Sequence, residues 1–571
     1  MTGTDTDAAI ARLRRQAQRA PGDANTMHNL AVLLFRNGQA DQALYFEERA
    51  ARMRPGVGDF HATLGTILAM AGRRAEAIDA IRHAIAVEPH RASHHLAFVP
   101  LLWERGEHEA VLASAQAAFD LDPAAARAPL SSVLLNIGEA DRAIGVLRAG
   151  LAITPDDPWL LSSLASTLNY VDGPAHEISD VLRRAGLSLA ARALPLPPPL
   201  GAGPPDPNRR LRVGLLSSDL YDHSVAAFLE PILVHHDRAA LEIHALSSRS
   251  LSTADAVTQR LRASCRAWHD LSMADHESLA RRVHALNLDI IVDLAGHTAP
   301  TLLLGLASRL APFQFTYLGY PNTTGIPAMD ARLVDAVTDP PGSDHLATER
   351  LIRLPGCFLC YQPPADAPEP TQRPAGRALR FGSFNNCSKL TPKMLAAWAA
   401  ILLAVPGSVL VLKSRQFSSP MVRRTILDRL CTSGLDRARV EIHEPSDSKS
   451  DHLAAYAGVD IALDPFPYHG TTTTCEALWM GVPVVTLAGD RHASRVGMSL
   501  LTAVGLTELI ADSPARYERI ATELARSPDR LALWRAGLRG KVAASPLCDA
   551  AGFARRFECV LRDAWITKVR P

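Results

Sequence analysis

A period of 34 residues in the first part of the chain constrains the fold more than any other feature of the sequence. From about residue 23 to 157 a glycine and a proline recur at that spacing, with a shortened last copy. The markers of the copies are Gly38, Gly72, Gly106 and Gly138, with Pro55, Pro89, Pro123 and Pro155. A small residue follows each glycine five positions later, at Ala43, Ala77, Val111 and Ala143. Because each glycine lies between two apolar stretches with helical spacing, the pattern predicts helix–turn–helix units.

These markers have one physical explanation. The glycine permits the turn, the small residue lets two helices approach, and the proline stops the second helix. The period and pattern are those of tetratricopeptide repeats, so we predict an α-helical solenoid over residues 1–192, less regular at its end. The concave face of such an array can hold a polypeptide, and we expect a polypeptide to dock in that groove. A spacer or a dimerisation surface is the alternative.

Residues 193–210 are rich in proline and glycine and predict a linker. After them, short apolar segments alternate with stretches of helix length, which predicts parallel sheets with crossover helices. The segments form two sets, 212–219, 242–248, 289–296, 315–321 and 331–337, then 380–386, 408–414, 440–445, 460–466 and 482–489. We therefore predict two Rossmann-like domains, at residues 211–375 and 376–571. Ligands of such sheets bind outside the carboxyl ends of the strands, so polar residues just after the strands are the site candidates.

The balance of charges argues against a polymeric anion as the main partner. With 60 basic and 59 acidic residues the net charge is +1, so no bulk field attracts nucleic acid or an anionic membrane. The first 20 residues lack the apolar core of a signal peptide, and no apolar run approaches the roughly 20 residues of a membrane span. We expect a cytoplasmic protein without a membrane partner.

The cysteines do not predict a metal or redox centre. Only Cys357 and Cys360 form a CxxC pair, and neither a second pair nor a nearby histidine cluster completes a zinc set. Two semi-buried thiols are the preferred interpretation, and we expect neither a metal nor another cofactor.

Two loops of the first predicted domain carry candidate residues. Asp219 and His223 stand at the end of the first predicted strand, in SSDLYDHSV, where a histidine near an acid suits catalysis. A histidine that only caps or packs the loop is the alternative. Leu318, Gly319 and Pro321 belong to LGYPNTTG, which follows another strand and either lines a cleft or forms a structural turn.

The second predicted domain offers groups that suit a phosphate. Asn386 and Lys389 lie between a strand and a helix that opens at Thr391, where the lysine either reaches a phosphate or stays a solvated surface residue. Lys449 and His452 follow another strand.

The stretch from Gly470 to Glu476 predicts a strand end, a loop and a helix start. Backbone N–H groups and threonine hydroxyls at such a start bind a diphosphate well, which makes Thr471, Thr472 and Thr473 candidates. Glu476 is placed to grip ribose hydroxyls. The structural alternative is a capping box formed by Thr473 and Glu476. Neither a GxxxxGK[ST] loop nor a GxSxG elbow is present in the sequence, which disfavours chemistry of those types.

With these motifs in this order, nearly the whole chain resembles the O-linked N-acetylglucosamine transferase family. That family joins tetratricopeptide repeats to a two-lobed, GT-B-type catalytic unit. The motifs that carry the resemblance are SSDLYDH, LGYPNTTG, FNNCSK, the pair Lys449 and His452, GTTTTCEALWMGVP, and ASRV at 493–496. Bacterial members resemble the chain most, since the span 340–380 has no room for the additional domain of the larger animal members.

The resemblance implies an inverting, metal-independent transfer of N-acetylglucosamine from UDP-N-acetylglucosamine to Ser or Thr hydroxyls of polypeptides. His223 matches the family's active-site histidine and Asp219 its neighbouring acid. Lys389 matches the lysine that contacts the diphosphate, where it can stabilise the charge of the leaving group in place of a metal. Asn386 stands where the family often has Gln.

The remaining matches concern the nucleotide. Lys449 matches the lysine on the ribose, and His452 matches the ring that stacks on uracil. The family's diphosphate-binding pair and its ribose-binding acid match Thr472, Thr473 and Glu476.

The sequence also departs from the family. A proline-rich linker replaces the histidine-rich stretch of animal members, so a base role falls on His223, on water or on the donor phosphate. An arginine expected shortly after the Lys-x-x-His pair is absent, because Ala454 and Ala455 follow Leu453. Transfer of fucose from GDP-fucose, or of glucose, on the same scaffold is therefore an alternative, as is a catalytically silent repeat adaptor. A sugar-nucleotide epimerase shares the two-lobed fold, but the docking array disfavours it.

Overall fold

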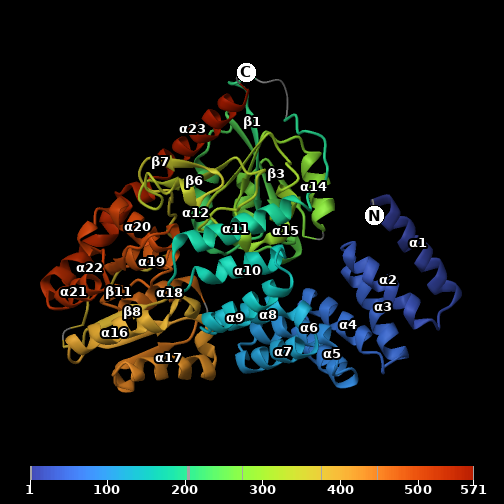
Figure 1. The fold of residues 1–571 in the computed structure, drawn as a ribbon, viewed down its shortest axis with the longest axis horizontal. Coiled ribbons are helices and arrows are strands. Elements are labelled where there is room, and N and C mark those ends of the chain that lie inside the picture. Colours follow the sequence, from blue (N-terminus) through green and yellow to red (C-terminus); the bar gives the residue numbers. More distant parts are fainter. Residues whose placement is uncertain (1–2, 202–205, 273, 375, 447, 570–571) are drawn as a thin grey trace. The chain divides into compact units, whose positions relative to one another are not determined.

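The structure, a computed structural model, describes all residues except 1–2, 202–205, 273, 375, 447 and 570–571 (Figure 1). Residues 202–205 of the predicted linker thus lie outside the described residues. The chain divides into two compact units, Met1–Ile137 and Gly138–Pro571.

The described part of the first unit consists of α-helices in sequential pairs. They are α1 (Gly3–Arg19), α2 (Ala24–Arg36), α3 (Ala40–Met53), α4 (Gly58–Met70), α5 (Arg74–Val87), α6 (Ala92–Glu104), α7 (His108–Leu121) and α8 (Pro123–Asn136). The glycine markers Gly38, Gly72 and Gly106 have φ values of 75°, 78° and 73°, in the left-handed region that favours glycine. The small residues Ala43 and Ala77 are fully buried between helices, as their spacing predicts.

The second unit begins with three more helices and continues into two α/β lobes. The helices are α9 (Ala140–Ile153), α10 (Pro158–Leu168) and α11 (Ala175–Ala190). Leu189 of α11 lies in the same buried cluster as Leu216 and Leu246, which come from the first two strands of the first lobe. The end of the helical array is therefore part of the core of that lobe.

Each lobe contains one parallel sheet. The first has the order β3-β2-β1-β4-β5-β6-β7 and the second β10-β9-β8-β11-β12-β13. The strands of the first are β1 (Leu211–Ser217), β2 (Leu241–Ser247), β3 (Ala267–Asp270), β4 (Ile290–Asp293), β5 (Phe313–Thr316), β6 (Ala331–Asp335) and β7 (Arg350–Leu354). Those of the second are β8 (Arg380–Ser383), β9 (Val409–Lys413), β10 (Val440–His443), β11 (Ile461–Leu463), β12 (Val484–Leu487) and β13 (Ile510–Ala511).

Both orders are of the doubly wound type, in which the direction of winding reverses once. The reversal lies between β1 and β4 in the first sheet and between β8 and β11 in the second. This arrangement, preceded by helical repeats, confirms the predicted fold class.

The remaining α-helices connect and cover the strands. They are α12 (Ser224–His235), α13 (Ala256–Ser264), α14 (His276–His284), α15 (Pro300–Leu306), α16 (Pro392–Ala404), α17 (Pro420–Thr432), α18 (Lys449–Ala454), α19 (Thr472–Trp479), α20 (Val496–Val504), α21 (Pro514–Ala525), α22 (Pro528–Ala543) and α23 (Ala550–Val569). The last helix, α23, returns to the first lobe and packs on α12 (Figure 1). There Phe557 lies 6.3 Å from the ring of Phe315 and 5.9 Å from that of Tyr317.

Three strands, β3, β7 and β13, were not predicted. All three are edge strands; β3 and β7 have partly exposed side chains, and β13 has only two residues. None of them has the continuous apolar run that marks a strand buried on both faces, so the sequence pattern alone could not identify them.

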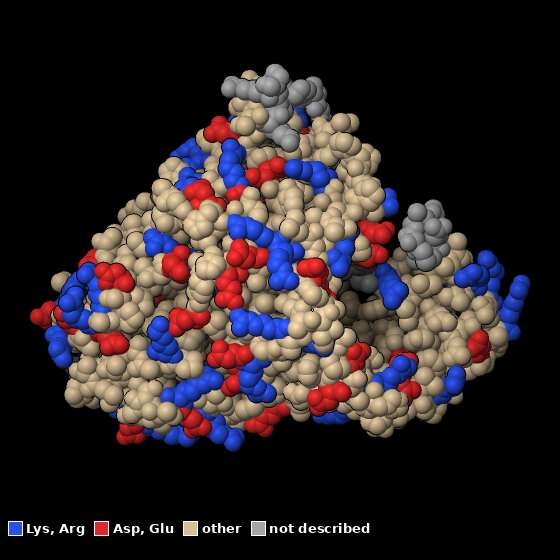
Figure 2. All heavy atoms as spheres, viewed as in Figure 1, with Lys and Arg blue, Asp and Glu red and all other residues tan. Residues whose placement is uncertain are grey.

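The described helices include none long and apolar enough to cross a membrane. On the face that Figure 2 shows, basic and acidic side chains are interspersed, in keeping with the near-zero net charge.

Candidate functional site

Lys389 lies just after β8, at the point where the winding of the second sheet reverses. Its Nζ donates a hydrogen bond to the carbonyl oxygen of His469 at 2.6 Å and lies 4.4 Å from the ring centre of Tyr468. Burial lowers the pKa of Lys389 to about 8, although the nearby carboxylate of Asp464 acts in the opposite direction. Since neither close partner is a carboxylate, the ammonium is available to an anionic ligand.

Asn386 holds the turn that carries Lys389. Its side-chain oxygen accepts hydrogen bonds from the backbone N–H of Ser388 at 3.0 Å and from Gln416 Nε2 at 2.7 Å. Helix α16 then starts where the sequence predicts, with Thr391 accepting a hydrogen bond from the N–H of Met394. The structure thus gives Asn386 a positioning role for Lys389.

At the N-terminus of α19, the side chains of Thr471 and Thr472 have no capping or hydrogen-bond partner among the described residues. Thr471 precedes the helix but makes no side-chain cap within the described residues. The hydroxyl oxygen of Thr472 is buried and has no partner there either, while Thr473 donates to Asn385 Oδ1 at 3.0 Å. The capping box of Thr473 and Glu476 does not form, because Thr473 lies inside the helix and Glu476 bonds elsewhere.

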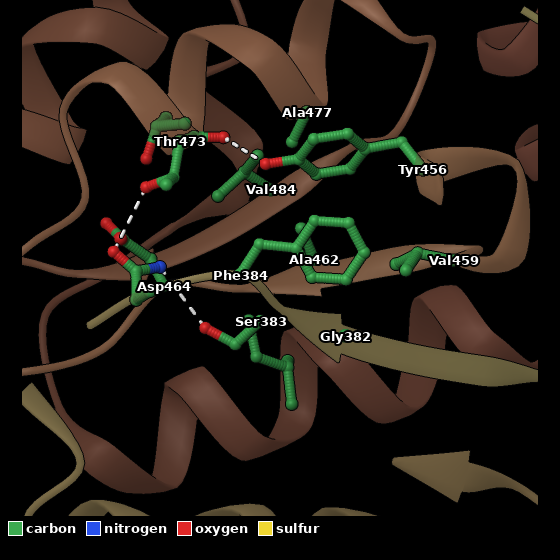
Figure 3. Close-up of a pocket in the computed structure, with 13 residues that line it drawn as sticks. Gly382, Ser383, Phe384, Tyr456, Val459, Ala462, Asp464, Thr473, Ala477 and Val484 are labelled. Carbon is green, nitrogen blue, oxygen red and sulfur yellow. Dashed lines mark hydrogen bonds between the residues drawn. The ribbon is translucent and has the colours of Figure 1, made fainter. Parts of the chain in front are cut away.

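A cavity beneath α19 is too small for a nucleotide. Its volume is about 10 Å³, enough for about one water molecule. Figure 3 shows Thr473 and Tyr456 on one side of it and Ser383 on another. The interior beneath α19 is therefore packed, and the polar groups described here lie at its border.

Glu476 contacts two other candidate residues of this lobe, Lys449 and His452. It is 2% exposed, accepts hydrogen bonds from Lys449 Nζ and, at 3.0 Å, from His452 Nε2, and has Tyr456 Oη at 3.5 Å. Burial alone would raise the pKa of Glu476, but the hydrogen bonds and charges of His452 and Lys449 bring it below its ordinary value. The three residues form one hydrogen-bonded cluster, and its lysine is 41% exposed.

In the first lobe, His223 is the residue before α12. The ring is exposed, and its Nδ1 accepts a hydrogen bond from the N–H of Val225 at 3.3 Å. In the neutral ring the proton then sits on Nε2. In the described residues no hydrogen bond joins it to Asp219, whose own N–H bonds Ser217 Oγ at 2.9 Å. The cap predicted as the alternative is therefore present, and Nε2 of the exposed ring keeps an N–H that it can donate.

The segment LGYPNTTG is a tightly constrained turn at the carboxyl edge of the first sheet. Leu318 has a φ of 73°, unusual for a residue with a side chain. A Cβ atom on Gly319 would lie 1.9 Å from the carbonyl oxygen of Leu294, so only glycine fits there. Leu318, Gly319 and Pro321 are half-buried. The structural turn and the cleft lining predicted for this segment are thus compatible.

Helix α10 ends beside both lobes, which the sequence did not predict. Tyr170 stacks on Tyr468, with 4.8 Å between ring centres and 12° between ring planes. Its neighbour Asn169 accepts a hydrogen bond from Asn322 of the first lobe at 2.9 Å. Because Tyr468 also contacts Lys389, the end of α10 forms one wall of the candidate site.

The described residues contain one group that could hold a metal ion, and it lies far along the sequence from this site. Asp59, Glu88 and His94 belong to the first unit. Arg91 forms ion pairs with Asp59 at 2.5 Å and with Glu88 at 3.1 Å. The guanidinium of Arg91 therefore already supplies the positive charge that a metal ion would bring to this group.

Comparison with known proteins gives a consistent picture. The profile of the family described as Glycosyl transferase family 41 matches residues 203–362 and 372–557. A solved structure of a variant of the Thermobaculum terrenum O-GlcNAc transferase is similar with a TM-score of 0.76 and 33% sequence identity, covering 96% of this chain and 98% of that one.

Two curated plant proteins, both named as probable UDP-N-acetylglucosamine–peptide N-acetylglucosaminyltransferases, are also similar. SPINDLY of Oryza sativa is 41% identical over 423 residues, 73% of this chain and 45% of its own. SEC of Arabidopsis thaliana is 28% identical over 370 residues, 62% of this chain and 37% of its own. The chain spans less than half the length of these curated relatives.

Proposed function

Because the chain belongs to glycosyl transferase family 41, we propose that it transfers a sugar from a nucleoside diphosphate sugar to hydroxyl groups of a polypeptide. For the donor we propose UDP-N-acetylglucosamine, as the names of its relatives indicate, and for the acceptor Ser or Thr. The observation that carries this proposal is the grouping of Lys389, the open start of α19 and the Glu476 cluster at one sheet edge.

We propose that the diphosphate binds between Lys389 and the N-terminus of α19. Lys389 bonds the carbonyl of His469, two residues before Thr471, so both lie at the same place. Unpaired N–H groups, the free hydroxyl of Thr472 and the ammonium all favour negative charge. The ribose then reaches Lys449 and Glu476, with the base against His452.

The proposed reaction is a direct displacement with inversion. The acceptor oxygen forms a bond to the anomeric carbon while the bond from that carbon to the diphosphate oxygen breaks. Negative charge grows on the departing diphosphate, where Lys389 and the helix-end donors stabilise it, and we propose that no metal is needed. The hydroxyl proton passes to the diphosphate or to water.

His223 is proposed as a hydrogen-bond donor in this reaction. With Nδ1 accepting from Val225, the ring offers Nε2–H rather than a basic nitrogen. It can hold a phosphate of the donor or the acceptor hydroxyl in place. We therefore propose that His223 acts as a hydrogen-bond donor and not as the general base.

Replacement of His223 distinguishes the two roles. We expect His223→Ala to lower transfer at least tenfold with UDP affinity within a few-fold, because one positioned hydrogen bond is lost. His223→Gln should recover part of the rate, since its amide N–H stands where Nε2–H was. Equal losses in both variants would favour a general base, and a wild-type rate in His223→Ala would remove it from either role.

The donor is tested by calorimetry with UDP-N-acetylglucosamine, GDP-fucose and UDP-glucose, followed by mass spectrometry of a peptide library incubated with each. We expect binding and peptide modification with the first, unchanged by EDTA. A preference for GDP-fucose or UDP-glucose would change the donor, and binding without modification would support the silent adaptor. Loss of activity with EDTA, restored by a divalent metal, would contradict the metal-free mechanism.

A further inference from the structure

Lys413, the last residue of β9, is a buried cation next to the proposed base site. It is 4% exposed and lies beside the end of β10, where its register partner is His443. Its Nζ donates to Ser446 Oγ at 2.5 Å and to His452 Nδ1 at 3.2 Å, and lies 5.5 Å from the ring centre of Phe384. None of these partners is a carboxylate, so within the described residues Lys413 has no direct counter-ion.

Lys413 fixes the chemical state of His452. An ammonium has donors only, so Nδ1 of His452 must accept from it, and the ring proton must sit on Nε2. From there His452 donates to Glu476 Oε2 at 3.0 Å. Phe384 and Tyr456 meet the ring at angles of 61° and 89°, which holds its plane. Both ring nitrogens are thus occupied by protein, and only a ring face is left for a ligand.

Among the described residues, one N–H of the Lys413 ammonium has no hydrogen-bond acceptor. Of its three hydrogens, two have acceptors among the described residues, in Ser446 and His452. The ring of Phe384 is its other close neighbour, and an aromatic face is a weaker acceptor than a carbonyl oxygen. Burial lowers the pKa of Lys413, while Glu476 and Asp451 raise it and Lys449 lowers it further. A new acceptor at this position would relieve part of the cost of burying the charge.

We propose that Lys413 selects the nucleobase of the donor by donating a hydrogen bond to a carbonyl oxygen of the base that stacks on His452. This inference rests on the proposed function. Uracil and guanine present a carbonyl on the edge that faces away from the sugar, whereas adenine presents an amino group there, which a donor-only cation repels. Lys413 thereby supplies from β9 the cation that is missing after His452, where Leu453 and Ala454 stand instead.

Binding of UDP, GDP, ADP and pyrophosphate to the full chain, measured by calorimetry, tests the inference. We expect the wild type to bind UDP or GDP at least tenfold more tightly than ADP. In Lys413→Met, which keeps the length of the side chain, the preferred nucleotide should lose about tenfold or more and the three affinities should converge within a few-fold, because one charged hydrogen bond is gone. Pyrophosphate should bind as before, which shows that the site is folded. Lys541→Met, on α22, is the matched control and should change nothing.

A second measurement does not depend on any ligand. In protein labelled with ¹⁵N-histidine, the His452 signals are identified by their loss in His452→Gln. We expect an unprotonated Nδ1 and a protonated Nε2 in the wild type, and a shifted Nδ1 signal in Lys413→Met.

Each outcome decides a separate point. A Lys413→Met protein that keeps the wild-type preference against ADP overturns the inference but leaves the proposed function intact. Loss of pyrophosphate binding in that variant also overturns it, because Lys413 would then support the whole site. A wild type that binds no nucleoside diphosphate rejects the proposed function, and the inference with it.

Discussion

Replacing Lys389 with methionine should lower sugar transfer by about a hundredfold or more, because one lost charge contact to a leaving group costs on the order of 3 kcal/mol of transition-state stabilisation. The fold should not suffer. Burial already lowers the pKa of Lys389 to about 8, so its charge is held at a cost that methionine removes. We expect single-turnover rates to fall while the melting temperature is unchanged or higher. Lys393→Met, four residues further along the chain and 62% exposed, is the control that should keep full activity.

The pH dependence of UDP binding is a second test of the role of Lys389. Below about pH 8 Lys389 carries its proton and attracts the diphosphate, and above that pH it is increasingly neutral. The affinity for UDP should therefore fall as the pH rises past 8, by at most about tenfold per pH unit. Binding near pH 8 should also take up protons, visible in buffers of different ionisation enthalpy. The fall should be absent in Lys389→Met. A variant with near-normal transfer, or with the wild-type pH profile, would rule out the leaving-group role.

Removing the first unit should abolish transfer to polypeptides while leaving nucleotide binding intact. The reason is that Gly138–Pro571 forms its own compact unit and contains all the candidate site residues. A chain that starts at Gly138 should bind UDP within a few-fold of the full chain, measured by calorimetry. Full activity of that fragment on protein acceptors would reject the proposed docking of the acceptor on the repeats.

A longer deletion, of residues 1–192, should destroy the catalytic unit itself. It removes α10 and α11, and with them the hydrogen bonds from Arg491 to the carbonyl oxygens of Leu168 and Val171 at 3.1 and 2.9 Å. It also opens the apolar cluster that contains Leu189. We expect an aggregating product, and Leu189→Ala in the full chain should lower the free energy of unfolding by about 2–5 kcal/mol. A folded, UDP-binding fragment that starts at residue 193 would show that α10 and α11 are dispensable.

The sequence was informative wherever a pattern is local. Helix pairs repeat every 34 residues because each turn needs its own glycine, and Gly38 and Gly72 have the positive φ that this requires. Buried parallel strands read as apolar runs, so ten of the strand segments could be predicted, and the polar residues after them were candidates for a ligand site. The edge strand β3 was not predicted, because its half-exposed residues do not form a continuous apolar run.

Other features were fixed only by the tertiary structure. Lys413 lies in the strand predicted at 408–414, but nothing in SVLVLKS shows that its ammonium contacts the ring of His452, 39 residues later. Tyr170 lies in the helical array and Tyr468 in the second lobe, and only folding stacks them beside Lys389. Local patterns in the sequence were enough to predict the helical repeats, the buried strands and the sheet edge where polar groups gather, because turn geometry and strand burial act over a few residues. Packing between segments far apart in the chain decided which of those groups form hydrogen bonds and ion pairs. These interactions depend on distances of a few ångströms, which no local pattern specifies.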